Sequence, residues 1–471
     1  MTIKLTNVRK LIFIVTIISG FISAESALAQ ASAGSISGPL KSDTVGSPNH
    51  NFIYNTSAIE LKKHGYVEEE FYIEGKANRY SSPEMQNADI VDSDHPYLSR
   101  FYVRRPPAKD FNGTVVIEWL NVTGGTDKDI DWWQSGHHFV RNGYAYIGVS
   151  AQRVGIESLK EWSPERYGKL DVSNGGAITN DALSYDIFSA VAKAVTRKDG
   201  KNSAQSVDIL GGLKADKIIA TGHSQSASRL AVYFNNVHPL EPLFDGAIIH
   251  GGGGKIRDDQ NVKIFKLMAE TDMARRAADP QPNTQYFRQW EVAGSSHVDV
   301  PFEVEYARAR LLADGKPLDQ AAPRAQDCDL PAYSHVPFRD VMNAAFEHMQ
   351  VWVETGTAPP TAEPLALVRM LPQVEFARDE RGNILGGIRL ATHEVATATN
   401  TGMNSGGNRF CRLYGSHQAF SAEQLKQLYP NHKKYVDAVK AVVNQNLADG
   451  YILPFAAERT IREAEQSTIG R

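Results

Sequence analysis

The stretch that decides the fold is KIIATGHSQSA, at residues 217–227. Its first five residues are typical of a short buried strand, and the residues from Ser226 onward predict a helix. Ser224 therefore stands at the apex of a tight turn, where its hydroxyl is pushed out of the sheet. The residues two positions away must be small, and Gly222 and Ser226 both are, although glycine is usual at the second position. The alternative is a serine that only caps the helix.

A serine hydroxyl becomes a strong nucleophile only beside a base that an acid orients. In a sheet with this kind of turn, the acid and then the histidine follow the serine, each after a later strand. His297 follows a predicted strand at 286–292, and we expect it to be the base rather than a solvated loop residue. Asp272 follows the strand predicted at 262–268 and is our first choice for the acid, with Glu270 as the alternative.

The negative charge that forms on the substrate oxygen needs backbone N–H donors. One should come from Gln225, directly after the serine, and the other from Asn121 or Val122, in the loop after a strand predicted at 114–119. The glycine-rich run HGGGG, at 250–254, resembles such a donor loop but follows the serine in sequence. We therefore expect this run to be a flexible loop at the rim of the site.

Three further residues are candidates for the wall of a substrate pocket: His223, Trp132 and Trp133. Core packing is the alternative for the two tryptophans. Arg275 and Arg276 follow the acid directly, and we expect them on a solvated surface, with a contact to a substrate carboxylate as the alternative. This chemistry requires neither a metal ion nor an organic cofactor, and we expect none.

Strands and helices alternate along most of the chain. The segments with strand composition are 66–73, 98–103, 114–119, 144–149, 217–221, 246–249, 262–268 and 286–292, and those with helical character are 131–140, 181–196, 226–234 and 336–355. This alternation predicts an α/β fold with a mainly parallel central sheet and helices on both faces. We expect this core to span 61–360. A C-terminal extension at 361–471, with a hairpin around 379–383 and a helical tail opened by Ser421, should pack on it.

The composition and the N-terminal sequence limit the classes to which this protein can belong. The 471 residues are 42% hydrophobic with a formal net charge of −4, which argues against binding nucleic acid, because that needs a basic face. An early cluster of positive charges, an apolar run at 11–22 and the sequence Ala27-Leu28-Ala29 predict a signal peptide at 1–29, with an uncleaved anchor as the alternative. We expect export to the periplasm or beyond, no membrane anchor after cleavage, and a flexible segment at 30–60.

Export changes the interpretation of Cys328 and Cys411, the only two cysteines. In an oxidising compartment we expect them to form a disulfide, with two buried free thiols as the alternative. The disulfide would tie the C-terminal extension to the region around Cys328.

Five motifs give the chain a family resemblance. They are EWLNVTGG at 118–125, GHSQSA at 222–227, AETD at 269–272, AGSSHVD at 293–299 and GTAPP at 356–360. On these motifs the chain resembles the α/β-hydrolase superfamily, and more narrowly the secreted bacterial "α/β hydrolase domain-containing" proteins, from about residue 66 to the C-terminus. The resemblance implies an α/β-hydrolase fold and serine ester hydrolysis on Ser224, His297 and an acid at Asp272 or Glu270. It implies no particular substrate.

We therefore expect an exported serine hydrolase that cleaves a small-molecule carboxylic ester through an acyl-enzyme. The same three groups are compatible with an amidase, a peptidase or an acyltransferase. A non-catalytic binding protein on the same scaffold is the remaining alternative. The sequence does not indicate an oligomeric state.

Overall fold

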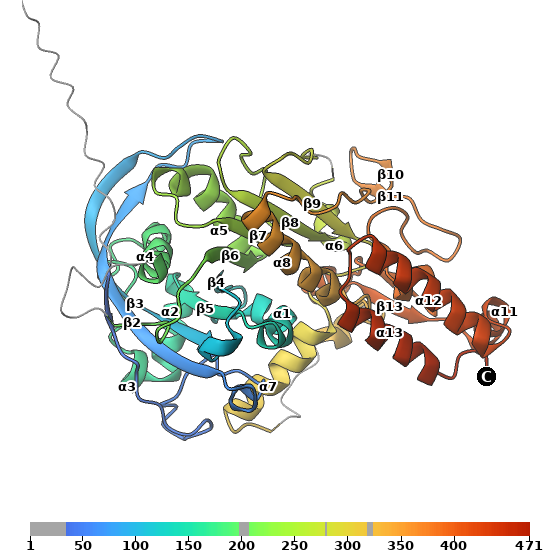
Figure 1. The fold of residues 1–471 in the computed structure, drawn as a ribbon, viewed down its shortest axis with the longest axis horizontal. Coiled ribbons are helices and arrows are strands. Elements are labelled where there is room, and N and C mark those ends of the chain that lie inside the picture. The colour runs from blue at the N-terminus through green and yellow to red at the C-terminus, as the bar shows by residue number, and fades with distance from the viewer. Residues whose placement is uncertain (1–33, 197–206, 278–279, 318–323) are drawn as a thin grey trace, which may run out of the picture. The chain divides into compact units, whose positions relative to one another are not determined.

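The computed structural model describes residues 34–196, 207–277, 280–317 and 324–471. A nine-stranded sheet runs through this part of the chain in the order β1-β2-β3-β5-β4-β6-β7-β8-β9 (Figure 1). Its strands are β1 (Ser35–Ser37), β2 (Val67–Tyr80), β3 (Ile90–Arg105), β4 (Thr114–Trp119), β5 (Ala145–Ser150), β6 (Lys217–His223), β7 (Gly246–His250), β8 (Lys263–Ala269) and β9 (Phe287–Val292). The predicted signal peptide lies outside the described residues.

Strands β4 to β9 run parallel to one another, whereas β1, β2 and β3 form an antiparallel edge. Every residue of β4 and β5 is buried. Such runs without polar alternation are expected where helices cover both faces of a parallel sheet. The predicted α/β fold with a mainly parallel central sheet is confirmed.

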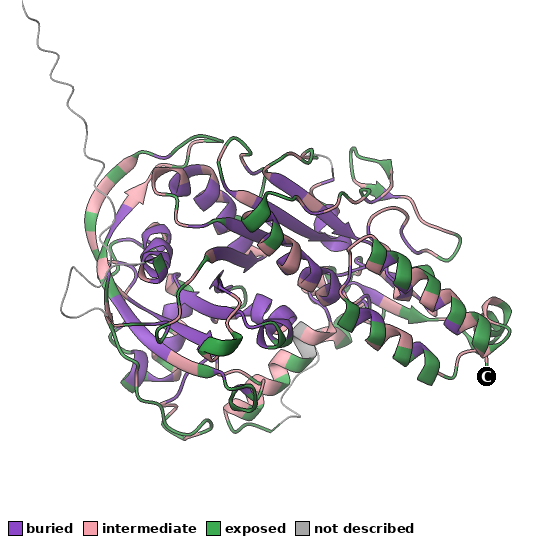
Figure 2. Cartoon of the chain, viewed as in Figure 1, coloured by how far each residue is buried: buried purple, intermediate pink, exposed green. Residues whose placement is uncertain are grey.

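Helices α1 to α8 surround the sheet. They are α1 (Ile130–Arg141), α2 (Arg153–Trp162), α3 (Pro164–Tyr167), α4 (Ser184–Thr196), α5 (Gln225–Val232), α6 (Glu270–Met273), α7 (Ala307–Ala313) and α8 (Phe338–Thr355). Helices α4 and α5 pack on one face, and α1 and α8 on the other (Figure 1). On the first face the rings of Phe188 and Trp119 are 4.8 Å apart, and on the second those of Phe139 and Phe346 are 4.7 Å apart. Buried residues concentrate in these layers (Figure 2).

The edge strands β2 and β3 are longer than the strands predicted at 66–73 and 98–103. They pair with each other well beyond the five residues that link β3 to β5. Polar and charged side chains cover this two-stranded extension, and an ion pair between Arg79 and Asp92 crosses it. A search for apolar runs misses the extension because polar and charged residues dominate its sequence.

The region after α8 forms four short strands, two one-turn helices and three longer helices. They are β10 (Leu367–Arg369), β11 (Glu375–Phe376), α9 (Ala391–Glu394), β12 (Ala398–Thr401), α10 (Cys411–Tyr414), β13 (Ser416–Ala419), α11 (Ala422–Leu428), α12 (His432–Ala448) and α13 (Pro454–Gln466). Ser421 and Gln424 form a capping box at the start of α11. Helices α12 and α13 contribute Val443 and Ala457 to the same apolar core as α1 and α8. Their outer faces are exposed (Figure 2).

Residues 34–60 pack more closely on the core than the flexible segment expected there. Strand β1 pairs with β2 at the edge of the sheet, and Phe52, Ile53 and Tyr54 are buried. This apolar triplet sits in a stretch rich in Ser, Gly and Asn, whose average composition hides it. In the part of the chain that the structure describes, no helix is long and apolar enough to cross a membrane.

Candidate active site

Ser224 lies between the end of β6 and the start of α5, at the turn predicted from the sequence. Its backbone has φ +60° and ψ −111°, a combination that residues with a side chain rarely adopt. A Cβ on Gly222 would lie 3.0 Å from Leu230 Cδ1 and 3.0 Å from Ser226 Oγ, so strand and helix leave little room there. Ser226 fits where glycine is usual because its buried hydroxyl donates to the His223 carbonyl at 2.9 Å.

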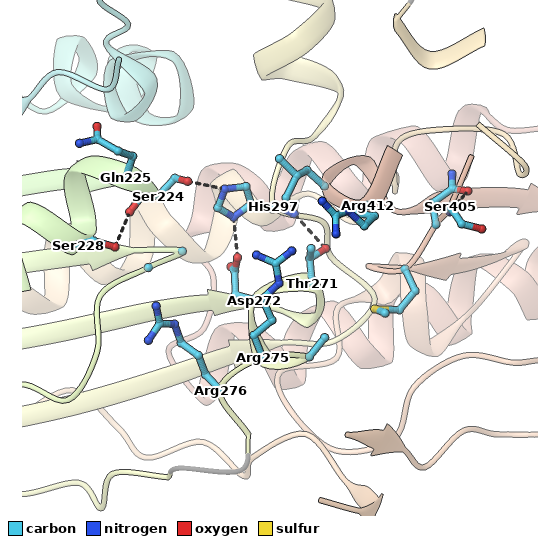
Figure 3. A pocket seen from close by; sticks show the side chains of 16 residues that line it. Ser224, Gln225, Ser228, Thr271, Asp272, Arg275, Arg276, His297, Ser405 and Arg412 are labelled. Carbon is cyan, nitrogen blue, oxygen red and sulfur yellow. Dashed lines mark hydrogen bonds and ion pairs between the residues drawn. The ribbon is translucent and has the colours of Figure 1, made fainter. Parts of the chain in front are cut away.

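Three side chains from separate strand ends meet at this turn (Figure 3). His297 Nε2 lies 2.8 Å from Ser224 Oγ, and His297 Nδ1 lies 2.5 Å from Asp272 Oδ1. His297 is on the loop after β9, and Asp272 is in α6, directly after β8. Because β6, β8 and β9 are parallel, their carboxyl ends reach the same edge of the sheet and the loops converge there. A continuous path of hydrogen bonds thus joins the carboxylate to the hydroxyl.

Asp272 is buried, with its second carboxylate oxygen also satisfied. Asp272 Oδ2 accepts a hydrogen bond from the Ala269 N–H at 2.8 Å. Burial by itself raises the pKa of Asp272, but the charge of His297 and the hydrogen bonds from His297 and Ala269 outweigh it and hold the pKa below its usual value. The carboxylate is therefore ionised near neutral pH and accepts from the Nδ1–H of His297. This leaves Nε2 free to accept the proton of Ser224.

Glu270, the alternative acid in the sequence analysis, is directed elsewhere. Its Oε1 accepts from the Arg378 guanidinium at 2.5 Å, and its side chain is fully buried. Burial raises the pKa of Glu270 although Arg378 opposes this shift. Of the two candidate acids, the structure brings Asp272 to His297 and pairs Glu270 with the C-terminal region.

A second layer of polar side chains lies behind His297, and the sequence analysis missed it. The His223 ring lies 4.4 Å from that of His297 and 4.3 Å from that of His250, between centroids. His223 Nε2 donates to the His297 carbonyl at 3.1 Å, and His250 Nδ1 lies 2.8 Å from Asp131 Oδ1. Burial, with the nearby His250 and His297, holds the pKa of His223 well below its usual value, so this ring is neutral. Within the described ranges no group of His, Cys, Asp and Glu is arranged to hold a metal ion.

The three candidate N–H donors to the negatively charged substrate oxygen have different surroundings. Gln225 is the first residue of α5, where a backbone N–H has no partner inside the helix. The Asn121 N–H is already engaged, because it donates to the Lys128 carbonyl at 2.9 Å. Its side chain donates to the His223 carbonyl at 2.7 Å and so ties this loop to the turn of the serine. Of the two loop candidates only Val122 has an N–H that no described residue accepts.

The glycine-rich run 250–254 lies at the centre of the site, not at its rim as expected. Gly251 and Gly252 line the cavity beside Ser224. A Cβ on Gly251 would lie 3.2 Å from Asp272 Oδ2 and 3.2 Å from His297 Nδ1. The reason is the strand order, because β7 lies between β6 and β8 and ends beside the serine and the acid. That order could be found only by knowing which strands are neighbours.

The three pocket candidates have different surroundings. His223 lines a small cavity beside Ser224. Trp132 is 2% exposed and packs in the core, 4.9 Å from Tyr146 between ring centroids. Trp133 contacts Tyr306 at 5.0 Å and is absent from the described lining of both cavities at Ser224. For Trp132 the core-packing alternative is the one observed.

Two cavities open at Ser224 and differ in size and character. The larger has a volume of about 730 Å³ and is lined by α5, the glycine-rich run, the α6 region and α10 (Figure 3). The smaller, about 60 Å³, is mainly apolar and is lined by Asn121, Thr123, Lys128, Ile130, His223, Ser224, His297, Val298, Phe410, Leu413 and Tyr414. Helix α10 contributes to both, and a disulfide between Cys328 and Cys411 anchors it.

A mainly parallel sheet, with a serine on a strained turn after one of its central strands and a histidine and an acid after later strands, defines an α/β hydrolase. The chain belongs to the family described as alpha/beta hydrolase domain, whose model matches residues 36–462. The match therefore includes the C-terminal region as well as the sheet.

Similar solved structures come from bacterial esterases. A glucuronoyl esterase from Teredinibacter turnerae is 12% identical with a TM-score of 0.23, and the alignment covers 48% of this chain and 47% of that one. Acetyl xylan esterase 1 from Thermoanaerobacterium is 9% identical (TM-score 0.25; 45% and 70% covered), and a glucuronoyl esterase from Solibacter usitatus is 10% identical (TM-score 0.25; 52% and 72% covered). The chain spans about half the length of the first of these. No curated protein matches the chain.

Proposed function

We propose that this protein is a serine hydrolase that cleaves a carboxylic ester through an acyl-enzyme on Ser224. The observation that carries the proposal is the path of hydrogen bonds from Asp272 through His297 to Ser224, on a strained turn that opens into a cavity. Strained backbone at such a position is a common feature of functional sites.

The proposed mechanism uses each group in one role. Ser224 Oγ attacks the ester carbonyl carbon while His297 Nε2 takes its proton, and ionised Asp272 holds the imidazole in the tautomer that can accept it. The N–H groups of Gln225 and Val122 stabilise the negative charge on the carbonyl oxygen. The tetrahedral intermediate collapses, the carbon–oxygen bond to the alcohol breaks, and His297 gives the proton to the leaving oxygen. Water then attacks the acyl-enzyme by the same route and releases the acid.

The small cavity supports a substrate with one short, uncharged group. Its volume is about 60 Å³, and Ile130, Val298 and Leu413 are among its apolar walls. A cavity needs about 10–15 Å³ of this kind of volume to hold one water molecule, so the space suits a short group of a few heavy atoms. An acetyl or a methoxy group fits this limit, whereas a long acyl chain would have to lie in the large cavity.

The replacement Ser224→Ala tests the proposal. With 4-nitrophenyl acetate we expect kcat to fall at least about 10³-fold, because the nucleophile is lost, while the melting temperature stays near that of the wild type. A fluorophosphonate probe should label the wild type and not the variant. Ser467→Ala, a serine change at the end of α13, is the matched control and should keep full activity. Undiminished turnover by the Ser224 variant would contradict the proposal, and turnover of a matched anilide at a similar rate would favour an amidase.

We also propose that the protein is exported and that residues 1–29 are removed. The disulfide between Cys328 and Cys411 supports this, since such bonds persist in oxidising compartments. Mass spectrometry of protein from the periplasmic fraction and the medium should find a chain that begins at Gln30. An intact Met1 on the recovered protein would contradict the proposal.

A further inference from the structure

The large cavity beside Ser224 contains three arginines that form no ion pair with any residue the structure describes: Arg275, Arg276 and Arg412. The first two follow α6, and the third is in α10, so two separate elements contribute the positive charge. In Figure 3 the side chains of Arg275 and Arg412 extend toward His297 from different sides. Arg275 and Arg412 are exposed at the cavity mouth, and Arg276 is half-buried.

Little negative charge faces these arginines. Asp272 is the one carboxylate among the described lining residues, and it is already bonded to His297. A neighbouring cavity of about 140 Å³ shares Arg275 and Arg276, adds Lys255 and Lys266, and has no carboxylate in its described lining. Positively charged residues therefore outnumber carboxylates in the described lining of both cavities, in a chain whose net charge is −4.

An anionic ligand in the large cavity would offset the repulsion between these arginines. Cations that face one cavity repel one another, and an anion bound between them replaces the repulsion with attraction. A guanidinium group presents two parallel N–H donors that match the two oxygens of a carboxylate. The attraction is stronger where water is partly excluded, as it is around half-buried Arg276.

We infer that the large cavity binds a carboxylate on one side of the scissile ester, while the small cavity holds a short uncharged group on the other side. This rests on the proposed function, because the ester bond is placed at Ser224, where the two cavities meet. Arg275, Arg276 and Arg412 then determine specificity without taking part in bond breaking. The substrate is either a short-chain acyl ester of an anionic alcohol or a small-alcohol ester of an anionic acid.

Two pairs of matched esters test the inference and identify the charged side. Monomethyl adipate is compared with methyl hexanoate, which places the charge on the acyl side and keeps a small alcohol on the other. The second pair, 3-acetoxybenzoate and 3-acetoxybenzamide, places it on the leaving group. We expect kcat/KM to be at least about tenfold higher for the anionic member of one pair. This preference should weaken in about 0.5 M NaCl, because salt screens exposed charges.

Arginine variants test which residues carry the preference. Arg275→Gln and Arg412→Gln should each reduce the ratio of kcat/KM between the anionic and neutral esters about two- to fivefold, and the double variant about tenfold. Arg462→Gln removes an exposed charge on α13 and should leave the ratio unchanged. Melting temperatures of all variants show whether the fold is intact.

The outcomes separate the inference from the proposed function. Equal kcat/KM within both pairs, in an enzyme whose turnover still requires Ser224, would overturn the inference alone. A preference that survives when Arg275, Arg276 and Arg412 are all replaced by Gln would overturn the assignment to this cavity. Absence of any Ser224-dependent turnover would overturn the proposed function, and the inference with it.

Discussion

Cys411 forms a disulfide with Cys328, 83 residues earlier in the chain, and so anchors α10 beside His297. The residues that follow Cys411 line both cavities at Ser224. The Leu413 carbonyl also accepts a hydrogen bond from the Val298 N–H at 2.9 Å, next to His297 in the chain. The disulfide therefore connects the stability of the fold to the shape of the site.

Replacing both cysteines by serine should affect stability and substrate binding together. We expect the double variant to lose about 4 kcal/mol of unfolding free energy, because a closed loop of this length restricts the unfolded chain. KM should rise more than kcat falls, because α10 lines the cavities and none of its side chains reaches Ser224 Oγ or His297 in the hydrogen-bond path. Urea titrations and steady-state kinetics measure the two effects. A variant with wild-type stability would refute the first expectation, and an unchanged KM the second.

The choice of acid between Asp272 and Glu270 leads to a second prediction. Asp272→Asn should lower kcat by about 10⁴-fold with little change in fold, because an amide favours the wrong tautomer of His297. Glu270→Gln should keep kcat within about tenfold of the wild type. It should instead lose about 3 kcal/mol of stability, since it breaks a buried ion pair with Arg378. The reverse pattern of kcat values would assign the orienting role to Glu270.

The sequence was sufficient to place the main parts of the site because each follows a recognisable strand. Ser224, Asp272 and His297 come directly after β6, β8 and β9, and in a parallel sheet these strand ends meet at one edge. The crowded turn at Gly222 can also be recognised in the sequence. Only small residues fit where a strand is followed directly by a helix. These features depend on neighbouring residues in the chain, which is why a single sequence reveals them.

The features that sequence reasoning left open or missed depend on contacts between distant segments. Asp272 and Glu270 differ only in the direction their side chains take from one short helix, and Arg378, more than a hundred residues away, captures Glu270. The N–H of Asn121 is used in a backbone hydrogen bond to Lys128, at the other end of the same loop. The layer formed by His223 and His250 requires knowledge of strand order. None of these contacts leaves a periodic pattern in the sequence.

The glycine-rich run offers a test of how closely the backbone packs against Ser224, Asp272 and His297. A Cβ on Gly252 would lie 2.5 Å from the Ser224 carbonyl oxygen, and Gly251 has φ +62° with its Cβ position against His297. Gly251→Ala and Gly252→Ala should each lower kcat more than tenfold and cost about 1–3 kcal/mol of stability, because the Ser224 backbone or the side chains of Asp272 and His297 must shift. Gly254→Ala is the matched control, since its Cβ would have no heavy atom within 4 Å. Circular dichroism gives the melting temperature of each of the three variants, and steady-state kinetics gives its kcat. Equal effects in all three variants would contradict the prediction.

Stability should depend on pH through His238, which is 2% exposed. Its Nε2 accepts the backbone N–H groups of Leu243 and Phe244, each at 3.2 Å, and burial lowers the pKa of His238 to about 4. In the unfolded chain this pKa is about 6.5, so between these two values the unfolded state binds more protons than the folded state. The contribution of His238 is therefore complete above about pH 6.5 and is lost as the pH falls, by up to about 3 kcal/mol at pH 4. His238→Gln keeps an acceptor for the two N–H groups and does not titrate. Urea unfolding at several pH values should give this variant a shallower loss of stability than the wild type, and parallel curves for the two proteins would show that His238 is not responsible.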